Sequence, residues 1–117
     1  VLLPVSAPFH CSLMKPAQER LKADLDAAVF ADLQIPLVNN WQAREIRTGE
    51  EAREGLYQQV PNPVRWTQTV RYLVTQSVGT FVEVGPGAVL TGLLRNIDAA
   101  SKGIKFGEAS DWDKLSA

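Results

Sequence analysis

The stretch between residues 80 and 106 constrains the fold of this chain more than any other. Residues 80–84 (TFVEV) are aromatic and β-branched, which predicts a strand, and Gly85-Pro86-Gly87 closes it. Apolar residues from 88 to 97 recur with helical spacing, and residues 104–106 (IKF) predict another short strand. A strand, a helix and a strand in this order predict a parallel pair joined by a helical crossover.

The first part of the chain predicts elements of the same kind. Residues 1–6 are apolar and predict a buried strand. The following helix is expected to carry Pro16 in its first turn, where a missing N–H does no harm. Residues 35–39 predict a second strand, and the polar stretch up to Arg47 predicts a loop or a weak hairpin arm.

Two further helices are predicted in the middle of the chain. Residues 48–51 (TGEE) form a capping box, and the helix that they open is expected to stop before Pro61. The next helix is expected to have Asn62 as its N-cap, Pro63 as its first residue and Gly79 at its end. The alternation of strands and helices predicts an α/β fold with a mainly parallel sheet and right-handed crossovers.

Composition narrows the class of protein. Of 117 residues, 45% are hydrophobic and 21% are charged, which predicts one small globular domain. The net charge is −1 and the basic residues are scattered, so we expect no nucleic-acid partner. One cysteine and one histidine allow no intrachain disulfide and predict no metal site. The apolar runs are far shorter than the roughly 20 residues that cross a bilayer, so no membrane segment is expected.

His10 is the only histidine, and it stands where the first predicted strand gives way to a helix. Histidine exchanges a proton near neutral pH, which makes a residue at such a junction a candidate general base. Alternatively, His10 caps the following helix or packs under a loop. The chain contains no G-x-S-x-G nucleophile elbow for the base to serve. We therefore interpret the chain as part of an acyl-transfer enzyme that carries the base without the nucleophile.

Four other features of the sequence have both a functional and a structural interpretation. Gly85-Pro86-Gly87 resembles a phosphate-cradling turn, or is a tight turn with positive φ at one glycine. Cys11 adjoins His10, but adjacent side chains point apart, so a Cys–His pair is not expected. Asn39-Asn40 offers amides and carbonyls to a site, or forms a plain turn. The double-proline corner at residues 59–63 leaves carbonyls unpaired by helices, and one of them could orient an imidazole.

Four motifs together resemble the bacterial malonyl-CoA:acyl carrier protein transacylase family and occur in the order found there. They are residues 4–16 (PVSAPFHCSLMKP), 36–40 (PLVNN), 59–66 (QVPNPVRW) and 83–93 (EVGPGAVLTGL). The resemblance implies that residues 1–110 are the C-terminal portion of the large α/β-hydrolase-like acyltransferase domain, a three-layer sandwich in the full enzyme. Residues 111–117 are expected to be a polar, loosely attached tail.

The resemblance also implies a ping-pong reaction. A serine takes malonyl from coenzyme A and passes it to the phosphopantetheine thiol of acyl carrier protein. By motif position, His10 is the base and the backbone carbonyl of Gln59 orients its ring. The serine, the malonate-binding arginine and part of the oxyanion hole lie N-terminal to the matched region in the family. None of the arginines here matches that binding position: Arg44, Arg47, Arg53 and Arg65.

Further expectations follow from the resemblance. The partners are malonyl-CoA, acyl carrier protein and the missing N-terminal part of the same cytoplasmic enzyme of fatty acid synthesis. No cofactor is expected, because coenzyme A thioester and phosphopantetheine are substrates. We expect the isolated chain to be inactive, and to be stable only when other polypeptide covers its apolar faces. Two alternatives stay open: an acyltransferase domain of a polyketide synthase, and a non-catalytic interaction module that retained the fold.

Overall fold

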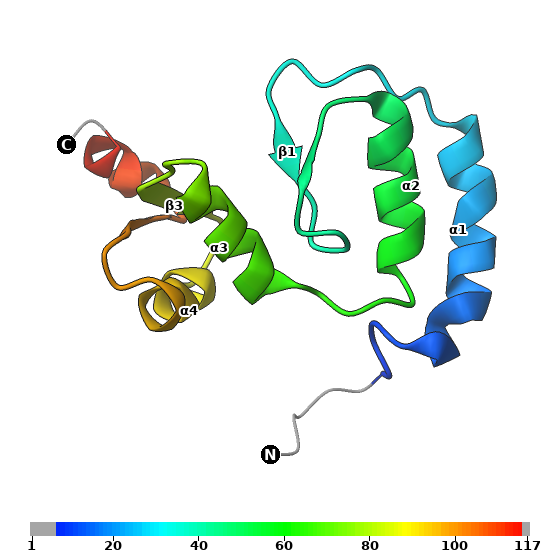
Figure 1. Cartoon of the computed structure of the whole chain (residues 1–117), viewed down its shortest axis with the longest axis horizontal. Coiled ribbons are helices and arrows are strands. Elements are labelled where there is room, and N and C mark those ends of the chain that lie inside the picture. Colours follow the sequence, from blue (N-terminus) through cyan, green and yellow to red (C-terminus); the bar gives the residue numbers. More distant parts are fainter. Residues whose placement is uncertain (1–6, 116–117) are drawn as a thin grey trace. The chain divides into compact units, whose positions relative to one another are not determined.

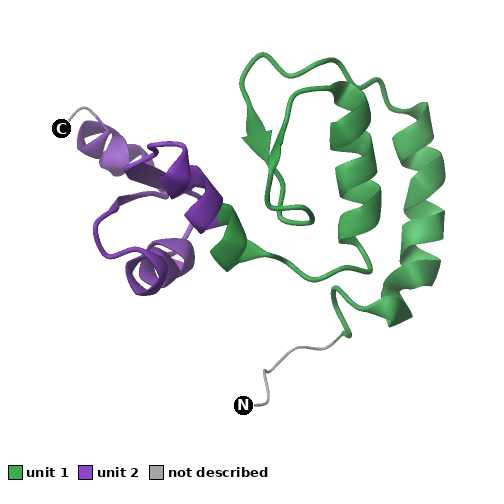
Figure 2. Cartoon of the chain, viewed as in Figure 1, with its two compact units in different colours: residues 1–69 green, residues 70–117 purple. Residues whose placement is uncertain are grey.

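The computed structural model describes residues 7–115, so the strand predicted at residues 1–6 lies outside the described residues. The chain divides into two compact units, residues 1–69 and 70–117, which are coloured separately in Figure 2. The division falls within one helix, α3 (Trp66–Thr75). Each unit is described by itself below.

The first unit is built on two antiparallel helices. A 3₁₀ turn, η1 (Ser12–Met14), leads into α1 (Lys15–Ala27), and α2 (Gly49–Gln59) runs beside α1 in the opposite direction (Figure 1). In the sequence between these two helices, β1 (Leu37–Val38) and β2 (Glu45–Ile46) form a short antiparallel hairpin. The predicted weak hairpin arm is therefore confirmed, although the strand expected at residues 35–39 is shorter and antiparallel.

The beginning of α2 follows the sequence prediction. The Thr48 hydroxyl accepts from the N–H of Glu51, and the Glu51 carboxylate accepts from the N–H of Thr48, which completes the capping box. Gly49 lets this end of the helix approach the segment after α1. A Cβ at Gly49 would lie 2.3 Å from the carbonyl oxygen of Phe30, closer than any real contact.

The prediction that α3 begins at Asn62-Pro63 is wrong, because α3 begins at Trp66. The side chain of Asn62 turns back and donates to the carbonyl of Gln58 at 2.7 Å, so it closes α2 and opens no helix. A residue before proline also disfavours helical backbone angles. Residues 63–65 are consequently a connecting segment without regular structure.

The predicted end of α3 at Gly79 is also wrong. Ser77 takes the left-handed conformation with φ of 65°, and the helix ends there in a Schellman motif. The N–H of Ser77 bonds to Val74 O at 3.0 Å, and the N–H of Val78 bonds to Leu73 O at 3.1 Å. The αL position that normally favours glycine is thus held by a serine.

The second unit contains the parallel β-α-β arrangement that the sequence predicts. β3 (Thr80–Val84), α4 (Val89–Ile97) and β4 (Lys102–Phe106) follow one another, and β3 pairs with β4 from Thr80↔Lys102 to Val84↔Phe106. Gly103 allows α4 to pack closely, because a Cβ there would lie 2.8 Å from Thr91 Cγ2. The mixed helix-and-strand architecture with a parallel pair confirms the α/β fold class.

The end of the chain differs from the loosely attached tail that was expected. Residues 109–114 form a 3₁₀ helix, η2 (Ala109–Lys114). Asp111 is buried and accepts from the N–H groups of Gly107 and Glu108, while Trp112 packs on Phe106 of β4 with ring centroids 5.9 Å apart. The sequence signal was polar composition, which does not reveal a carboxylate that caps its own turn. The domain boundary at residue 110 stays a prediction.

Many large apolar side chains of the described residues are exposed. The buried apolar side chains are Leu25, Ile46, Val70 and Leu94. In β3 and α4 alone, the exposed ones include Val82, Val84, Val89, Leu90 and Leu93. This exposure agrees with the expectation that further polypeptide covers the chain, which stays a prediction. No helix among residues 7–115 is long and apolar enough to span a membrane.

Candidate active site

His10 lies in the loop that leads into η1, and its backbone is unusual. Its φ of 55° puts a residue with a bulky side chain in the left-handed region, which costs conformational energy and often marks functional positions. Neighbouring bonds hold this turn: the N–H of Phe9 donates to Ala7 O at 3.0 Å, and the Cys11 thiol donates to Pro8 O at 3.1 Å. Cys11 therefore supports the loop and forms no pair with the imidazole in this geometry.

The His10 ring is tied to the end of α2. Its Nδ1 lies 3.0 Å from the backbone oxygen of Gln59, 49 residues further along the chain. A carbonyl oxygen can only accept, so this bond requires the proton on Nδ1. In the neutral ring, Nε2 then carries the free lone pair. The residue is exposed, so the ring is not enclosed by packing within the described residues.

The last carbonyls of α2 receive donors from separate parts of the first unit. A helix leaves its final C=O groups without partners in the helix. Gln18 of α1, which is buried, donates to Tyr57 O at 3.0 Å. Asn62 donates to Gln58 O, and the Gln59 oxygen receives both the N–H of Asn62 at 3.3 Å and the His10 ring. This helix end is the negative pole of the helix dipole, so it favours a cation beside it.

Asn39 and Asn40 serve the hairpin and its connection to α3. The Asn39 side chain accepts from the N–H of Gln42 at 2.8 Å, which makes the turn that was one of the two interpretations. Asn40 accepts from the Arg65 N–H at 2.8 Å and from the Thr69 hydroxyl at 3.2 Å. Both asparagines also line a cavity of about 300 Å³ between the hairpin and α2. Its lining consists of Leu37, Asn39, Asn40, Ile46, Ala52, Gly55, Leu56 and Gln59.

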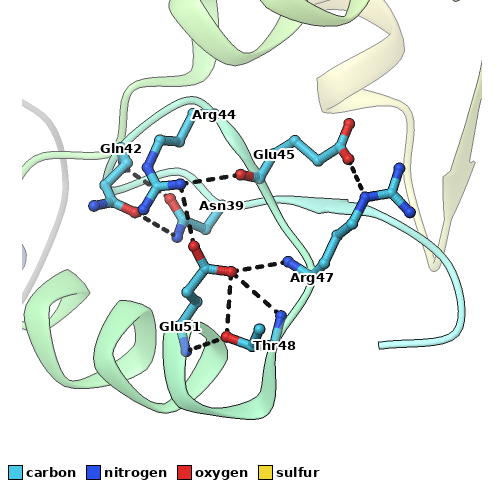
Figure 3. A network of polar contacts seen from close by, with 7 residues as sticks. All are labelled: Asn39, Gln42, Arg44, Glu45, Arg47, Thr48 and Glu51. Carbon is cyan, nitrogen blue, oxygen red and sulfur yellow. Dashed lines mark hydrogen bonds and ion pairs between the residues drawn. The ribbon is translucent and has the colours of Figure 1, made fainter. Parts of the chain in front are cut away.

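Figure 3 shows the polar network at the other end of α2. Arg44 donates to the Glu51 carboxylate at 3.2 Å, and Arg47 pairs with Glu45. The N–H groups of Arg47 and Thr48, more than the Arg44 side chain, hold the pKa of Glu51 below its usual value. These two arginines pair with carboxylates of their own chain, and their having no role in malonate binding stays a prediction.

The Gly85-Pro86-Gly87 turn of the second unit has positive φ at both glycines, 133° and 95°. The carboxylate of Glu83 accepts from the N–H groups of Thr91 and Leu90 at 2.8 and 3.0 Å, and from the Thr91 hydroxyl at 2.7 Å. These bonds hold the pKa of Glu83 below its usual value. The first N–H groups of α4 already have an anionic partner, which favours the tight-turn interpretation over a phosphate cradle.

The residues alone did not predict the hydrogen bonds made by three side chains, those of Gln18, Asn62 and Glu83. Gln18 is spaced with Leu21 and Leu25 on one face of α1, and that spacing was the available signal. Asn62 resembled the N-cap of the next helix, and Glu83 resembled an ordinary strand residue. The described residues hold no group of three or more His, Cys, Asp or Glu side chains placed to bind a metal ion.

No protein-family model matches the chain. Over 95 residues, the chain is 45% identical to the malonyl CoA-acyl carrier protein transacylase of Escherichia coli K12, a match covering 81% of the chain and 31% of the relative. A polyketide biosynthesis protein of Burkholderia thailandensis is 46% identical over 100 residues, 83% of the chain and 8% of that protein. The chain thus spans about a third of the length of the curated transacylases that it matches.

Solved structures agree with these relatives. An acyl carrier protein S-malonyltransferase from Vibrio cholerae matches with a TM-score of 0.91 and 37% identity, over 97% of this chain and 37% of that one. A malonyl-transacylase in complex with a type II polyketide synthase acyl-carrier protein matches with a TM-score of 0.90 and 39% identity, over 96% of this chain and 36% of that one. The chain therefore has the α/β acyltransferase fold. Within that class, it belongs to the malonyl-CoA:acyl carrier protein transacylase family and matches a C-terminal portion of its members.

Proposed function

We propose that the protein to which this chain belongs transfers a malonyl group from coenzyme A to the phosphopantetheine thiol of acyl carrier protein. His10 is its general base, and the Gln59 carbonyl orients the base. The observation that carries the proposal is the 3.0 Å contact between Nδ1 and the Gln59 oxygen in an exposed residue. Relatives with the same fold and 37–45% identity are malonyl transacylases, which supports this substrate class.

In the first half-reaction, Nε2 of His10 takes the proton of a serine hydroxyl as its oxygen attacks the malonyl thioester carbonyl. The C–S bond then breaks, and the imidazolium returns the proton to the departing coenzyme A sulfur. In the second half-reaction, the ring takes the proton of the phosphopantetheine thiol as its sulfur attacks the malonyl-serine ester. The serine oxygen leaves with that proton, so the ring ends each half-reaction neutral.

The chain supplies the proton carrier and its support. The Nδ1–H···O bond keeps the Nε2 lone pair directed outward, and the negative end of α2 stabilises the positive charge that the ring acquires between the two transfers. We propose that the serine, the arginine that binds the malonyl carboxylate and part of the oxyanion hole come from polypeptide N-terminal to the matched region. The reaction then needs no cofactor beyond its two substrates, the malonyl thioester of coenzyme A and the thiol of phosphopantetheine.

His10→Ala in the full-length protein tests this proposal. We expect turnover of malonyl transfer to fall by roughly 10²–10⁴-fold, the usual worth of a positioned acid–base group. The measurement is transfer of radiolabelled malonyl from coenzyme A to purified acyl carrier protein. Near-normal turnover would remove His10 from the mechanism. The isolated 117 residues are expected to transfer nothing, and measurable transfer would contradict the need for an external serine.

Two observations favour a second candidate, an acyltransferase that serves polyketide synthesis. The similar Burkholderia protein has a polyketide role by name, and one similar structure is a transacylase bound to a polyketide carrier protein. Competition between a fatty-acid and a polyketide carrier protein for the malonylated full-length protein would separate the two, through the ratio of kcat/KM. The non-catalytic module becomes the better interpretation if the full-length protein lacks a serine elbow.

A further inference from the structure

The proposed active site depends on the C-terminal end of α2, where the Gln59 carbonyl has to be held in a fixed direction. A carbonyl in the last turn of a helix has no partner within the helix, and such turns fray readily. If His10 depends on the Gln59 oxygen, then something has to fix the direction of that oxygen. Val60, the residue that follows, keeps helical backbone angles at φ −57° and ψ −51°. The Gln59 carbonyl therefore keeps its helical direction as long as the segment that follows holds Val60 in these angles.

Two amide side chains tie that segment to the helix, and we call Gln59 and Asn62 together the amide clamp. Asn62 Nδ2 donates to Gln58 O at 2.7 Å, and its backbone N–H donates to Gln59 O at 3.3 Å. In return, Gln59 Nε2 donates to Asn62 O at 2.9 Å and to Pro63 O at 3.3 Å. The four bonds join the last turn of α2 to the connecting segment in both directions.

The His10 ring has little else to hold it. The residue is exposed, its loop is strained at φ 55°, and within residues 7–115 its ring bonds to Gln59 O alone. An exposed ring keeps its rotational freedom unless the one group that it bonds to is itself held in place. A shift of about 1 Å in a catalytic group can cost on the order of 10²-fold in rate.

We propose that Asn62 is a positioning residue for His10: its amide group, acting through the α2 carbonyls, fixes the Gln59 oxygen that orients the imidazole. The inference rests on the proposed function, since it assigns a role within the same site. It also explains why Asn62 turns away from α3, where its sequence context predicts a cap. Without the bond from its side chain to Gln58 O, the Asn62 backbone N–H that donates to Gln59 O is held less firmly, and the ring gains rotational freedom.

Asn62→Ala in the full-length protein is the test, and Asn96→Ala is the matched control. Asn96 Nδ2 also donates to the carbonyl four residues earlier, Gly92 O, but in the exposed helix α4. We expect Asn62→Ala to lower kcat for malonyl transfer by about 10-fold, with KM for malonyl-CoA changed less than about twofold, because binding groups are untouched. We expect Asn96→Ala to change neither.

A spectroscopic readout separates positioning from a loss of folded protein. The Nδ1–H signal of His10 in ¹H–¹⁵N spectra, assigned by its absence in His10→Ala, should move upfield or broaden in Asn62→Ala and stay in place in Asn96→Ala. If Asn62→Ala does not fold by circular dichroism, Gln59→Leu takes its place, because it removes the other half of the clamp and keeps the carbonyl.

The outcomes divide cleanly between this inference and the proposed function. If kcat stays within about twofold and the Nδ1–H signal does not move, Asn62 has no positioning role, even where His10→Ala is inactive. If His10→Ala is active, the proposed function itself fails, whatever Asn62→Ala does. A loss in kcat with an unchanged Nδ1–H signal would also overturn the positioning role, since the effect would then not pass through the ring.

Discussion

The two ends of α2 satisfy their free backbone groups, N–H at the beginning and C=O at the end, with different sets of partners. At the beginning, the Thr48 hydroxyl accepts from the N–H of Glu51 (Figure 3), and the Asp32 carboxylate accepts from the N–H of Gly49 at 3.0 Å. At the end, the free carbonyls take donors from α1, from the His10 loop and from Asn62. The first end is thus closed mainly by residues 47–51, with Asp32 as one partner from a segment 17 residues away. The second end depends on distant segments and therefore brings them together, which is what an active site requires.

The largest expected effect comes from crowding the beginning of α2. Gly49→Ala would put a Cβ 2.3 Å from Phe30 O, a backbone atom that cannot yield without moving its segment. We expect a loss of about 2–3 kcal/mol of unfolding free energy, as for overpacked sites. Urea unfolding of the full-length protein measures it. Gly92→Ala is the control: among the described residues, no atom outside the neighbouring backbone lies within 4 Å of its Cβ, so it should stabilise α4 slightly.

A somewhat smaller loss is expected at the dependent end when a donor is removed. Gln18→Met keeps length and helix propensity but leaves the Tyr57 carbonyl without its 3.0 Å partner. An unsatisfied buried acceptor costs about 1–3 kcal/mol. The exposed Gln68→Met serves as the control and should unfold at the urea midpoint of the unsubstituted protein. Equal midpoints for the two variants would show that Gln18 does not hold this helix end.

Removing the cap should separate stability from turnover. Thr48→Ala deletes the hydroxyl that accepts the Glu51 N–H, and the expected cost is about 1 kcal/mol of unfolding free energy. Malonyl transfer should keep its kcat, because this end of α2 does not touch His10. Thr48→Ser retains the hydroxyl and should restore most of the stability. A loss in kcat for Thr48→Ala comparable to that of Asn62→Ala would contradict the division between the two ends.

Acid should weaken the same N-terminal cap of α2, with a smaller loss of unfolding free energy than Thr48→Ala causes. The N–H groups of Arg47 and Thr48 hold the pKa of Glu51 below its usual 4.5 in the folded state. A lowered folded-state pKa means that the stabilisation is complete above pH 4.5 and is lost as pH falls through the folded value. Comparing the urea midpoints of the unsubstituted protein and Glu51→Gln from pH 6 to pH 3 measures this. The difference should shrink towards acid, and a constant difference would rule out the linkage.

The sequence predicted those parts of the fold that depend on hydrogen bonds between near neighbours or on a regular pattern of apolar residues. The capping box at residues 48–51, the turn at Gly85-Pro86-Gly87 and the β-α-β order all appear where expected. The errors occur where a local pattern had two solutions. Asn62-Pro63 can open a helix or close the one before it, and here Asn62 closes α2. Gly79 can end α3, but α3 ends earlier, at Ser77. Which solution wins depends on contacts that the local pattern does not contain.

For the candidate site, the residues alone indicated His10 and a free carbonyl near the double-proline corner. The pairing of His10 with Gln59 in particular came from resemblance to the family, and the structure has the two atoms 3.0 Å apart. The roles of Asn62 and Gln18 were not predicted. Their side chains donate to the carbonyls of Gln58 and Tyr57, and these carbonyls lack a partner within the helix only because α2 ends at Gln59.

The amino-acid sequence by itself determined the kinds of element, their order and the self-closing turns. Periodicity and bonds between near neighbours require no knowledge of where the rest of the chain goes. Only the tertiary structure decided which donors meet the last carbonyls of α2, from residues 39 and 49 positions away in two cases. Such bonds form only after the loops between them have closed, so they depend on the packing of α1 against α2 and leave no pattern of their own in the sequence.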